Sequence, residues 1–509
     1  MIMARNEDGT YSQVGFVKDN ASIDTEYIYD KDGDIVFEKG FTRETSSTVP
    51  LTINGIGKYL KAWSITGNTV QNGTPTPDTP QEVKAVGDRT SNLLNFEDLI
   101  AAPSGEMSSK DFLFPHLLIL YLKPNTTYTC ASSGTGSTTS PPADLNRSLY
   151  FCSTSEHNSV NVNNPVTYTT DSTGRVFIGF IDYRTNAQQY LNKTAYIWLN
   201  EGSTALPYEP YGYKIPVVTR GKNLIDVANL TGKTNALFTD NINPKLAQVK
   251  FDEATQYTIS MKFEIDTSIG WRKITFTYTD GTTSVSPWIV KSDVFKYTST
   301  SGKTIAKVEF TNYNYYGDVY VEYIQLEAGT TATPYEPYHE PITTPIYLPT
   351  PLYSGEVMRS DGSREVKWGK IVLTGEEKIV AAGASGTSYR YDFTNIKTIS
   401  QIGYARKNSK ITHFKQCDMP AKDVVGYDWH GVSFHLMIMT TQSTINKFKD
   451  WLKSQYTAGT PVTIWYTLET PTTETFTAPQ IPTLNGTTVI DVDTAVKPTE
   501  MYTKYKSSK

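Results

Sequence analysis

A domain-sized internal repeat constrains the fold of this chain more than any other feature of its sequence. Residues 196–211 read YIWLNEGSTALPYEPY and residues 323–338 read YIQLEAGTTATPYEPY, so that 11 of 16 positions are identical at an offset of 127 residues. Upstream, Asn92-Leu93-Leu94 matches Asn223-Leu224-Ile225 at an offset of 131. Because the period has the size of a domain, the sequence predicts two copies of one module rather than a solenoid. Tandem copies of this kind are typical of proteins that bind or build.

The composition indicates that these modules are built from β-sheets. The 509 residues include 34 Tyr, 20 Phe and 8 Trp among many Thr and Ser, and these residue types favour strands. Each copy spans roughly 125 residues of short strands and polar turns without a helical period, as in a sandwich of jelly-roll type. We therefore expect a mainly β chain with tandem jelly-roll-like β-sandwich modules, a small β-rich head and a mixed, mostly β C-terminal domain.

Turn and proline patterns divide the chain into five predicted segments. In order, these are an N-terminal β-rich docking head at 1–65, a Pro-rich linker at 66–90, module 1 at 91–215, module 2 at 216–345 and a C-terminal β-rich domain at 346–509. The prolines of the linker favour an extended spacer. The Pro-Tyr-Glu-Pro-Tyr segment that closes each module is expected to hold neighbouring domains in a set orientation, because proline fixes φ.

The C-terminal domain is expected to contain one helix at 443–456 and an extended tail from 471 onward that lies along a neighbour. Apolar residues recur at helical spacing on one face of this helix: Ile445, Phe448, Trp451 and Leu452. Ser443 is expected to cap its first turn. In the head, carboxylates alternate from Asp30 to Asp34 as in a calcium loop, but the glycine and the distal glutamate are misplaced. A hairpin turn between two strands is the better interpretation.

Charge and hydropathy argue against several classes of protein. The net charge is −5 and the basic residues are scattered, so we expect no nucleic-acid binding. The longest apolar stretch, 112–122, is interrupted by Pro115 and His116 and is far shorter than the roughly 20 residues of a spanning helix, so no membrane insertion is expected. The first ten residues lack the apolar core of a secretory signal. Three cysteines predict no disulfide framework and indicate synthesis in a reducing cytoplasm.

Three segments of the sequence together resemble a known group of proteins. They are SITGNTVQNGTPTPDTPQEVKAVGDRTSNLL (64–94), LPYEPYGYKIPV (206–217) and IYLPTPLYSGEVMRSDGSREVKWGKIVLTG (346–375). These segments resemble the minor tail and baseplate proteins of phages and prophages of Gram-positive bacteria. The resemblance implies a virion structural protein of receptor-binding type, located at the tail tip or baseplate and synthesised in the host cytoplasm. It also implies carbohydrate-binding-like modules, other tail or baseplate proteins as partners, and a homo-oligomer, with a trimer favoured.

Catalytic motifs are not evident, and we predict no enzyme, no cofactor and no metal site. Cys417 follows His413 by four residues, but no recognised nucleophile or metal motif accompanies the pair. His435 lies in an apolar run, where a buried histidine with satisfied hydrogen bonds is the simpler interpretation. The acidic residues are scattered singly, and no spacing identifies the carboxylate pair of a glycosidase.

The loop before the last strand of each module offers the chemistry of a sugar-binding site. Flat aromatic rings can stack on sugar rings, and amide and carboxylate groups can bind the hydroxyls. The candidate ligand-binding residues are Asp182, Tyr183, Arg184, Tyr190, Asn312, Tyr313, Tyr315 and Tyr316. Trp271 and Trp288 are second-rank candidates, and core packing is the better interpretation for each. The alternative is that these tyrosines pack in strands or between subunits.

Three functions therefore compete. The first is attachment to host cell-wall polysaccharide through the modules, with weak contacts strengthened by multivalency. The second is a purely structural connector or decoration of the tail, without ligand binding. The third, and the least supported, is a cell-wall glycan hydrolase.

Overall fold

The computed structural model is mainly β, which confirms the predicted fold class. The structure describes residues 2–5, 11–15, 26–29, 35–42, 48–53, 59–60, 62–106, 113–134, 148–152, 157–160, 163–227, 245–246, 251, 255–265, 271–287, 295–313, 319–393, 409–417, 425–430, 435–484, 486–492, 496 and 500–506. In the strands before residue 59 and after residue 499, only the backbone is described.

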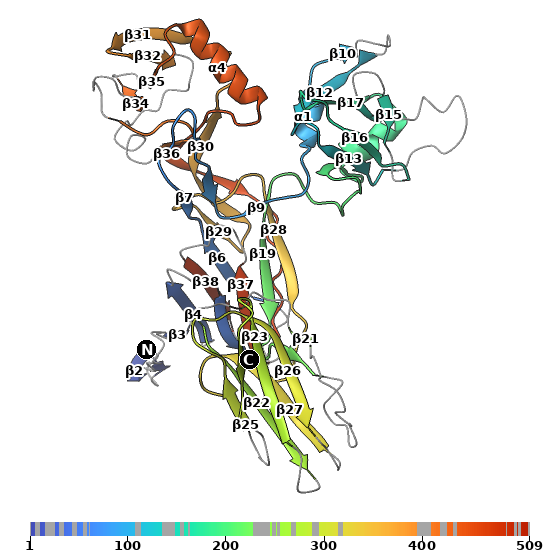
Figure 1. Ribbon diagram of the computed structural model, residues 1–509, viewed down its shortest axis with the longest axis vertical. Coiled ribbons are helices and arrows are strands. Elements are labelled where there is room, and N and C mark those ends of the chain that lie inside the picture. Colours follow the sequence, from blue (N-terminus) through green and yellow to red (C-terminus); the bar gives the residue numbers. More distant parts are fainter. Residues whose placement is uncertain are drawn as a thin grey trace.

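Two sheets form the centre of the molecule, which we call the spine (Figure 1). One sheet has the strand order β3 (Glu26–Tyr29), β4 (Ile35–Thr42), β38 (Glu500–Lys506), β6 (Ala62–Thr66), β29 (Val357–Arg359), β30 (Ser363–Val372), β36 (Thr463–Thr475), β33 (Lys410–Ile411). The other has the order β28 (Ile342–Leu348), β19 (Tyr213–Arg220), β37 (Gly486–Val492), β5 (Thr48–Ile53), and β9 (Asp88–Arg89) also pairs with β19. Buried apolar side chains from both sheets, among them Ile65, Met358, Ile215 and Ile490, share one core.

Three units are inserted into the spine, each between two strands that pair antiparallel with one another. Module 1 (91–211) lies between β9 and β19, where Arg89 pairs with Tyr213. Module 2 (221–340) lies between β19 and β28, where Thr219 pairs with Ile342. The C-terminal unit (373–462) lies between β30 and β36, where Val372 pairs with Thr463. The predicted boundaries 215/216 and 345/346 therefore fall inside spine strands. Figure 1 shows module 1 and the C-terminal unit at one end of the spine and module 2 toward the other.

Module 1 is a two-sheet sandwich. One sheet has the order β12 (His116–Tyr121), β17 (Arg175–Phe180), β14 (Leu149–Cys152), β15 (His157–Ser159), and the other has β16 (Val166–Thr169), β13 (Thr127–Ser132), β18 (Ile197–Glu201). Two short helices, α1 (Phe96–Ala101) and α2 (Gln188–Leu191), and a small pair of strands, β10 (Gly105–Glu106) and β11 (Leu113–Phe114), complete it. Its core includes Tyr128, Leu149, Ile178 and Leu199, which are buried between the sheets.

Module 2 repeats this strand order. Its sheets read β25 (Phe295–Thr298), β22 (Tyr257–Ile265), β27 (Val319–Ala328), and β24 (Thr283–Val285), β23 (Trp271–Tyr278), β26 (Ile305–Tyr313). These six strands correspond in sequence order and in neighbours to six strands of module 1: β16, β13, β18, β15, β14 and β17. A short pair, β20 (Ile225–Asp226) and β21 (Lys245–Leu246), lies near the start of the module. The duplication of sequence is therefore a duplication of fold.

The C-terminal unit packs one helix, α4 (Ile445–Thr457), against a sheet of β31 (Ile379–Ser385), β32 (Ser388–Phe393), β35 (His435–Thr440) and β34 (Gly426–His430). The predicted helix is confirmed, and its apolar face buries Phe448 and Leu452. The predicted cap is wrong by one residue. Thr444, not Ser443, has extended backbone and accepts a hydrogen bond from the Lys447 amide at 3.2 Å. It is therefore the last residue before the helical turns begin.

The ends of the chain and the predicted linker also contribute strands. The predicted hairpin of the head is confirmed, because β3 and β4 pair antiparallel with Tyr29 opposite Ile35. A separate pair, β1 (Ile2–Arg5) and β2 (Tyr11–Gly15), precedes it. The linker region contains the pair β7 (Thr69–Gln71) and β8 (Val83–Ala85). The tail returns as β37 and β38 in the two sheets of the spine, so the chain's own strands are its neighbours there.

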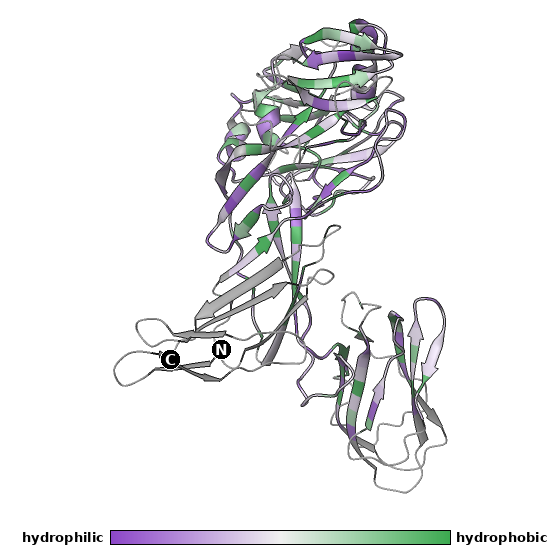
Figure 2. Ribbon diagram, turned by 90° about the vertical axis from the view of Figure 1, so that its left-hand side faces the viewer, coloured by the Kyte–Doolittle hydropathy of each residue, from purple (hydrophilic) through white to green (hydrophobic). Residues whose placement is uncertain are grey.

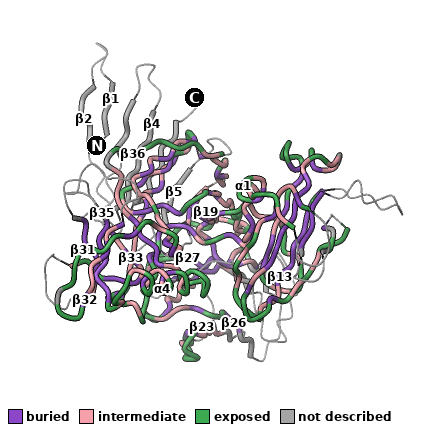
Figure 3. The backbone as a smooth tube through the Cα atoms, turned by 90° about the horizontal axis from the view of Figure 1, so that it is seen from above, coloured by how far each residue is buried: buried purple, intermediate pink, exposed green. Residues whose placement is uncertain are grey.

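Alternation of side chains explains why these segments form sheets. Along β19, intermediate and buried residues alternate from Lys214 to Arg220, which is the period of a strand with one face in a core. Hydrophilic and hydrophobic residues also alternate along many strands in Figure 2. Seen from above, buried residues gather inside the units while exposed residues lie along the outer turns and strand ends (Figure 3).

Candidate ligand-binding pocket

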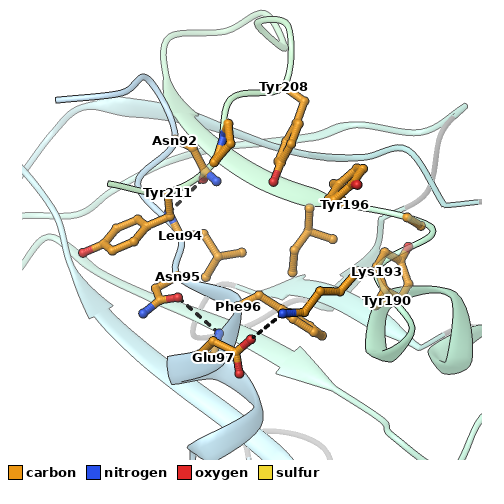
Figure 4. A pocket seen from close by; sticks show the side chains of 13 residues that line it. Asn92, Leu94, Asn95, Phe96, Glu97, Tyr190, Lys193, Tyr196, Tyr208 and Tyr211 are labelled. Carbon is orange, nitrogen blue, oxygen red and sulfur yellow. Dashed lines mark hydrogen bonds and ion pairs between the residues drawn. The ribbon is translucent and has the colours of Figure 1, made fainter. Parts of the chain in front are cut away.

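A cavity of about 330 Å³ opens in module 1, where the start of the module meets its last strand and its exit segment (Figure 4). We use exit segment for the Pro-Tyr-Glu-Pro-Tyr residues, 207–211 in module 1 and 334–338 in module 2. A volume of this size lies within the range of small-molecule sites. Its walls come from three places in the chain, which the fold brings together.

A buried asparagine positions the start of the module beside the last strand. Asn92 is 2% exposed, and its Oδ1 accepts hydrogen bonds from the amides of Leu94 at 2.9 Å and Leu199 at 3.1 Å. The Leu93 amide donates to the Leu199 carbonyl at 2.7 Å. Because a buried amide side chain without partners is costly, these bonds fix the backbone on which the next residues, Asn95 and Phe96, enter the pocket. We call Asn92 and its counterpart in module 2 the latch residues.

Three tyrosines line two sides of the cavity, and we call them together the aromatic wall. The rings of Tyr196 and Tyr208 stack with centroids 4.5 Å apart and planes 20° apart. Trp198 supports this pair: its ring meets Tyr208 edge-on at 5.7 Å, and its Nε1 donates to the Leu206 carbonyl at 2.8 Å. Tyr211 stands at the other side of the opening in Figure 4, with the Arg89 guanidinium 5.7 Å from its ring centre. Stacked rings at an opening offer flat apolar surface to a ligand.

Burial changes the acidity of one of these phenols. Desolvation, followed by the neighbouring Tyr196 and Tyr347, raises the pKa of Tyr208 above its ordinary value. A tyrosine hydroxyl with its ordinary pKa of about 10 is already protonated at physiological pH, and the upward shift leaves it so, which allows it to donate a hydrogen bond as well as accept one.

Polar groups form the opposite rim. Asn95 caps α1, and its Oδ1 accepts from the Glu97 amide at 3.2 Å. Glu97 Oε1 lies 3.6 Å from Lys193 Nζ, and both side chains are mostly exposed. An ion pair of this kind contributes little to stability, so ligand hydroxyls can replace it at little cost. Lys193 itself has φ of 56° just after α2, a backbone conformation that side chains other than glycine seldom adopt.

The floor is apolar and includes one residue predicted as a ligand contact. Leu94, Phe96 and Ile197 line it. Tyr190 borders the cavity but is 3% exposed and belongs to the core. Its hydroxyl is 2.6 Å from Ser132 Oγ, and its ring meets Phe180 edge-on at 6.2 Å. The helix α2 turns this side chain inward, so Tyr190 supports the floor and presents no open face.

The other predicted residues of module 1 lie outside the pocket. Asp182 pairs with His116, with 3.3 Å between Oδ2 and Nε2. Tyr183 is 71% exposed, and the Arg184 guanidinium lies 5.6 Å from its ring centre. These three residues form a separate polar and aromatic surface on the loop after β17.

The structure describes only the backbone of some predicted residues of module 2 and leaves the others outside the described residues. Asn312 and Tyr313 end β26 and pair with Arg272 and Trp271 through the backbone, while their side chains lie outside the described residues, as does that of Trp271. Tyr315, Tyr316 and Trp288 lie outside the described residues entirely.

The sequence prediction missed the aromatic wall, although a signal for it was present. Tyr196, Tyr208 and Tyr211 all belong to the strongest stretch of the repeat. That stretch was interpreted as framework because it joins domains. The same residues both join the domains and line the pocket, because the exit segment folds back over the last strand.

The histidine and cysteine cluster of the C-terminal unit has structural contacts. His413 is buried, its Nδ1 is 2.6 Å from Thr412 Oγ1, and its ring meets Trp451 edge-on at 5.7 Å. Burial lowers the pKa of His413. Cys417 Sγ donates to the Tyr427 carbonyl at 3.4 Å. Within the described residues, no three His, Cys, Asp or Glu side chains are grouped closely enough to hold a metal ion.

No protein-family model, curated protein or solved structure matches this chain. Among the described residues, no helix is both long and apolar enough to cross a membrane. The molecule is thus defined by its own architecture, as a mainly β protein in which two sandwich modules are inserted into a central spine.

Proposed function

We propose that this chain is a structural protein of a phage tail tip or baseplate and contributes to attachment at the host cell surface through its modules. The pocket of module 1 carries the proposal. A sugar ring has apolar faces and a rim of hydroxyls, and the pocket pairs stacked tyrosines with amide, carboxylate and ammonium groups. The proposed ligand is host cell-wall polysaccharide.

The strand order supports modules of carbohydrate-binding, jelly-roll type. The sheets β12-β17-β14-β15 and β16-β13-β18 interleave strands that are distant in sequence, as two Greek keys do. The bond from the Leu93 amide to the Leu199 carbonyl places the start of the module at the free side of β18, where a jelly roll has its first strand. We propose the same topology for module 2.

A virion presents several copies of such a pocket to one surface. The proposed homo-oligomer, a trimer by the resemblance, would present at least one pocket per chain. Because linked sites bind a polymer with an avidity well above that of one site, a weak pocket suffices for attachment.

Binding of purified host wall polysaccharide to the full-length protein tests the proposal. We expect Tyr208→Ala to weaken binding about tenfold, which corresponds to about 1.4 kcal/mol of lost stacking and hydrogen bonding. Tyr183→Ala is the matched control, because this tyrosine is exposed on the same module and lies outside the pocket. If the multimeric wild-type protein binds no wall polysaccharide, attachment through these modules is wrong. Loss in Tyr183→Ala alone would move the site to the loop after β17, and equal loss in both variants would contradict a site confined to the pocket.

We also propose that the pocket binds without hydrolysis. Glycosidases use two carboxyl groups separated by roughly 5–10 Å, and Glu97 is the one carboxylate among the described residues that line this cavity. Incubation with purified cell wall should release no reducing ends. Release that Glu97→Gln abolishes would contradict this.

A connector role is the second candidate, favoured by one exposed strand edge. β12 is the edge strand of its sheet, and Ile119 and Tyr121 are exposed along it. Exposed apolar edges invite pairing with another chain. If a baseplate protein covers this edge, Ile119→Lys should block assembly into particles and leave polysaccharide binding intact.

A further inference from the structure

Module 2 reproduces the stacked tyrosine pair of the module 1 pocket. The rings of Tyr323 and Tyr335 are 4.8 Å apart with planes 20° apart, against 4.5 Å and 20° for Tyr196 and Tyr208. Tyr335 is 39% exposed, so the stack is open to solvent as it is in module 1. The third tyrosine of the wall, Tyr211, has its counterpart in Tyr338.

The latch that positions the module 1 pocket is also present. Asn223 is buried, and its Oδ1 accepts from the amides of Ile225 at 3.3 Å and Leu326 at 3.1 Å. The Leu224 amide donates to the Leu326 carbonyl at 2.8 Å. The same backbone frame therefore carries Asp226 to the position that Asn95 occupies in module 1.

The support beneath the stack is kept with a different side chain. In module 1 the Trp198 indole donates to the carbonyl of residue 206. In module 2 the equivalent Gln325 Nε2 donates to the carbonyl of Thr333 at 3.3 Å, and its Oε1 accepts from the Glu336 amide at 2.8 Å. The exit segment is thus held over the last strand in both modules, although the supporting residue is not the same.

The charge around the stack differs between the modules. Asp226 replaces a neutral asparagine, and the Tyr338 hydroxyl donates to Glu340 Oε2 at 2.9 Å. Desolvation, followed by Glu340 and then Asp226, raises the pKa of Tyr338, so that phenol stays protonated. Lys222 pairs with Glu336 of the exit segment at 3.0 Å, so these two charges balance and Asp226 and Glu340 remain in excess. This excess of negative charge beside the aromatic surface favours ligands that are neutral or positively charged and disfavours anionic polymers. On the module 1 rim, the charge of Lys193 is balanced by Glu97, so this excess of negative charge is absent there.

We infer that module 2 carries a second sugar-binding site, formed by Tyr323, Tyr335, Tyr338 and Asp226, which takes neutral or amino sugars. The inference rests on the proposed function of the module 1 pocket and adds a second ligand-binding surface with a different charge preference. One chain would then contact two points of a wall polymer and discriminate between them.

Equilibrium binding of defined oligosaccharides to the full-length protein tests this inference. The probes are chitotetraose, which is neutral, its deacetylated form, which is cationic, and polyglycerol phosphate, which is anionic. We expect two chitotetraose sites of full affinity per chain for the wild type, one for Tyr208→Ala, one for Tyr335→Ala and none for the double variant, because each substitution weakens its own site about tenfold. Tyr335→Phe keeps the stack and should keep two.

A charge variant tests the site without disturbing the stack. Asp226→Asn reproduces the module 1 residue and should weaken binding of deacetylated chitotetraose about threefold, with little effect on chitotetraose. Polyglycerol phosphate should compete only for the module 1 site, which Tyr208→Ala weakens.

The outcomes separate this inference from the proposal on which it rests. If Tyr208→Ala abolishes all binding and Tyr335→Ala changes none, the second site is wrong while the module 1 pocket stands. If Tyr335→Ala alone removes binding, module 2 holds the site and the module 1 pocket is wrong. If the wild type binds none of the probes or wall polysaccharide, both are wrong. If hydrogen exchange shows that Tyr335→Ala disturbs the fold of module 2, Asp226→Asn becomes the test. In that case, an Asp226→Asn protein that binds deacetylated chitotetraose with the affinity of the wild type overturns the inference.

Discussion

The two modules hold the same exit segment in place through different partners. In module 1, Glu209 Oε2 accepts from the amide and the hydroxyl of Ser91, both at 2.8 Å, so the exit segment is tied to the module's own start. In module 2, Glu336 accepts from the amide of Thr487 at 2.7 Å and from its hydroxyl at 2.8 Å. Thr487 belongs to β37 of the spine. Duplication therefore preserved the glutamate and changed what it anchors.

The difference between the modules is the strand of the spine that each glutamate reaches. Lys222 occupies the position of Ser91 and lies 3.0 Å from Glu336 Oε1, while Lys214 serves Glu209. Each glutamate therefore has one partner at the start of its own module and one partner in the spine. In module 1 the spine partner is Lys214 of β19, whereas in module 2 it is Thr487 of β37.

The largest expected effect comes from the latch residues. Asn92→Ala should destabilise module 1 by about 2–3 kcal/mol, because two buried amides lose their acceptor. Asn223→Ala should cost more, since Asn223 also donates to the carbonyls of Ile324 at 3.3 Å and Glu336 at 3.2 Å. Native-state hydrogen exchange resolved by module measures both. Asn158→Ala, exposed on β15, is the control. An equal loss in the two modules would contradict this ranking.

The next effect tests which spine strand each glutamate holds. Glu209→Gln should lower the stability of module 1 by about 1–2 kcal/mol, the range for a hydrogen bond to a charged group. Glu336→Gln should cost a similar amount but also increase exchange in β37, because its partner lies there. Hydrogen exchange of peptides that cover 486–492 is the measurement. Exchange in β37 that rises in both variants would show that the two joints are not distinct.

Acid should weaken both joints together. Burial alone would raise the pKa of Glu209 and of Glu336, but hydrogen bonds from lysine, backbone and hydroxyl groups hold each pKa below the ordinary value of 4.5. A depressed pKa in the folded state means that the stabilisation is present above about pH 4.5 and is lost as pH falls through the folded pKa. Calorimetry between pH 3 and pH 6 should show a smaller dependence on pH in Glu209→Gln and Glu336→Gln. A variant as sensitive to acid as the wild type would exclude its glutamate as a source.

The smallest effect concerns the support beneath the stack. Trp198→Gln installs the module 2 residue, which can keep the bond to the Leu206 carbonyl but loses the edge contact with Tyr208. We expect a cost of about 1 kcal/mol. Trp198→Ala loses both and should cost more, as followed by thermal unfolding of module 1. If the glutamine variant were as unstable as the alanine variant, the hydrogen bond would not be shared between the modules.

Local patterns in the sequence predicted local structure. The repeat predicted two equivalent units, the alternating Tyr- and Thr-rich segments predicted strands, and the apolar spacing from Ile445 to Leu452 predicted α4. The strand and helix signals depend on residues that are close in the sequence, and the repeat is itself a pattern of residues, so each can be read from the sequence directly.

The spine could not be predicted, because its pairings join distant residues. β19 pairs with β28 and β37, and Arg220 Nε lies 2.7 Å from Asp491 Oδ2 across 271 positions. A strand pattern states which face is buried but not which strand lies beside it. For this reason the predicted division at 215/216 falls inside β19 and assigns one spine strand to two modules.

The pocket was out of reach for a related reason. Residue types identified aromatic loops as candidates. However, Tyr190 lies in α2 and is buried, whereas Tyr196 and Tyr208 stack because the exit segment folds back over the last strand. Exposure depends on packing that residue type does not encode.

The paired spine strands that flank each inserted unit, such as β9 and β19 for module 1, make that unit replaceable. The amide of Thr90 donates to the carbonyl of Gly212 at 3.1 Å, so the two chain ends left by removal of 91–211 are already neighbours. Gly212 has φ of 131°, and a Cβ atom there would lie 2.3 Å from the Leu348 carbonyl oxygen, so the residue at this junction must be glycine. Recombination or protein engineering can exchange the inserted module at this junction while the backbone hydrogen bonds of the spine sheets remain. Under the proposed function, exchange of a whole unit would change the ligand that the chain binds and leave the spine unchanged.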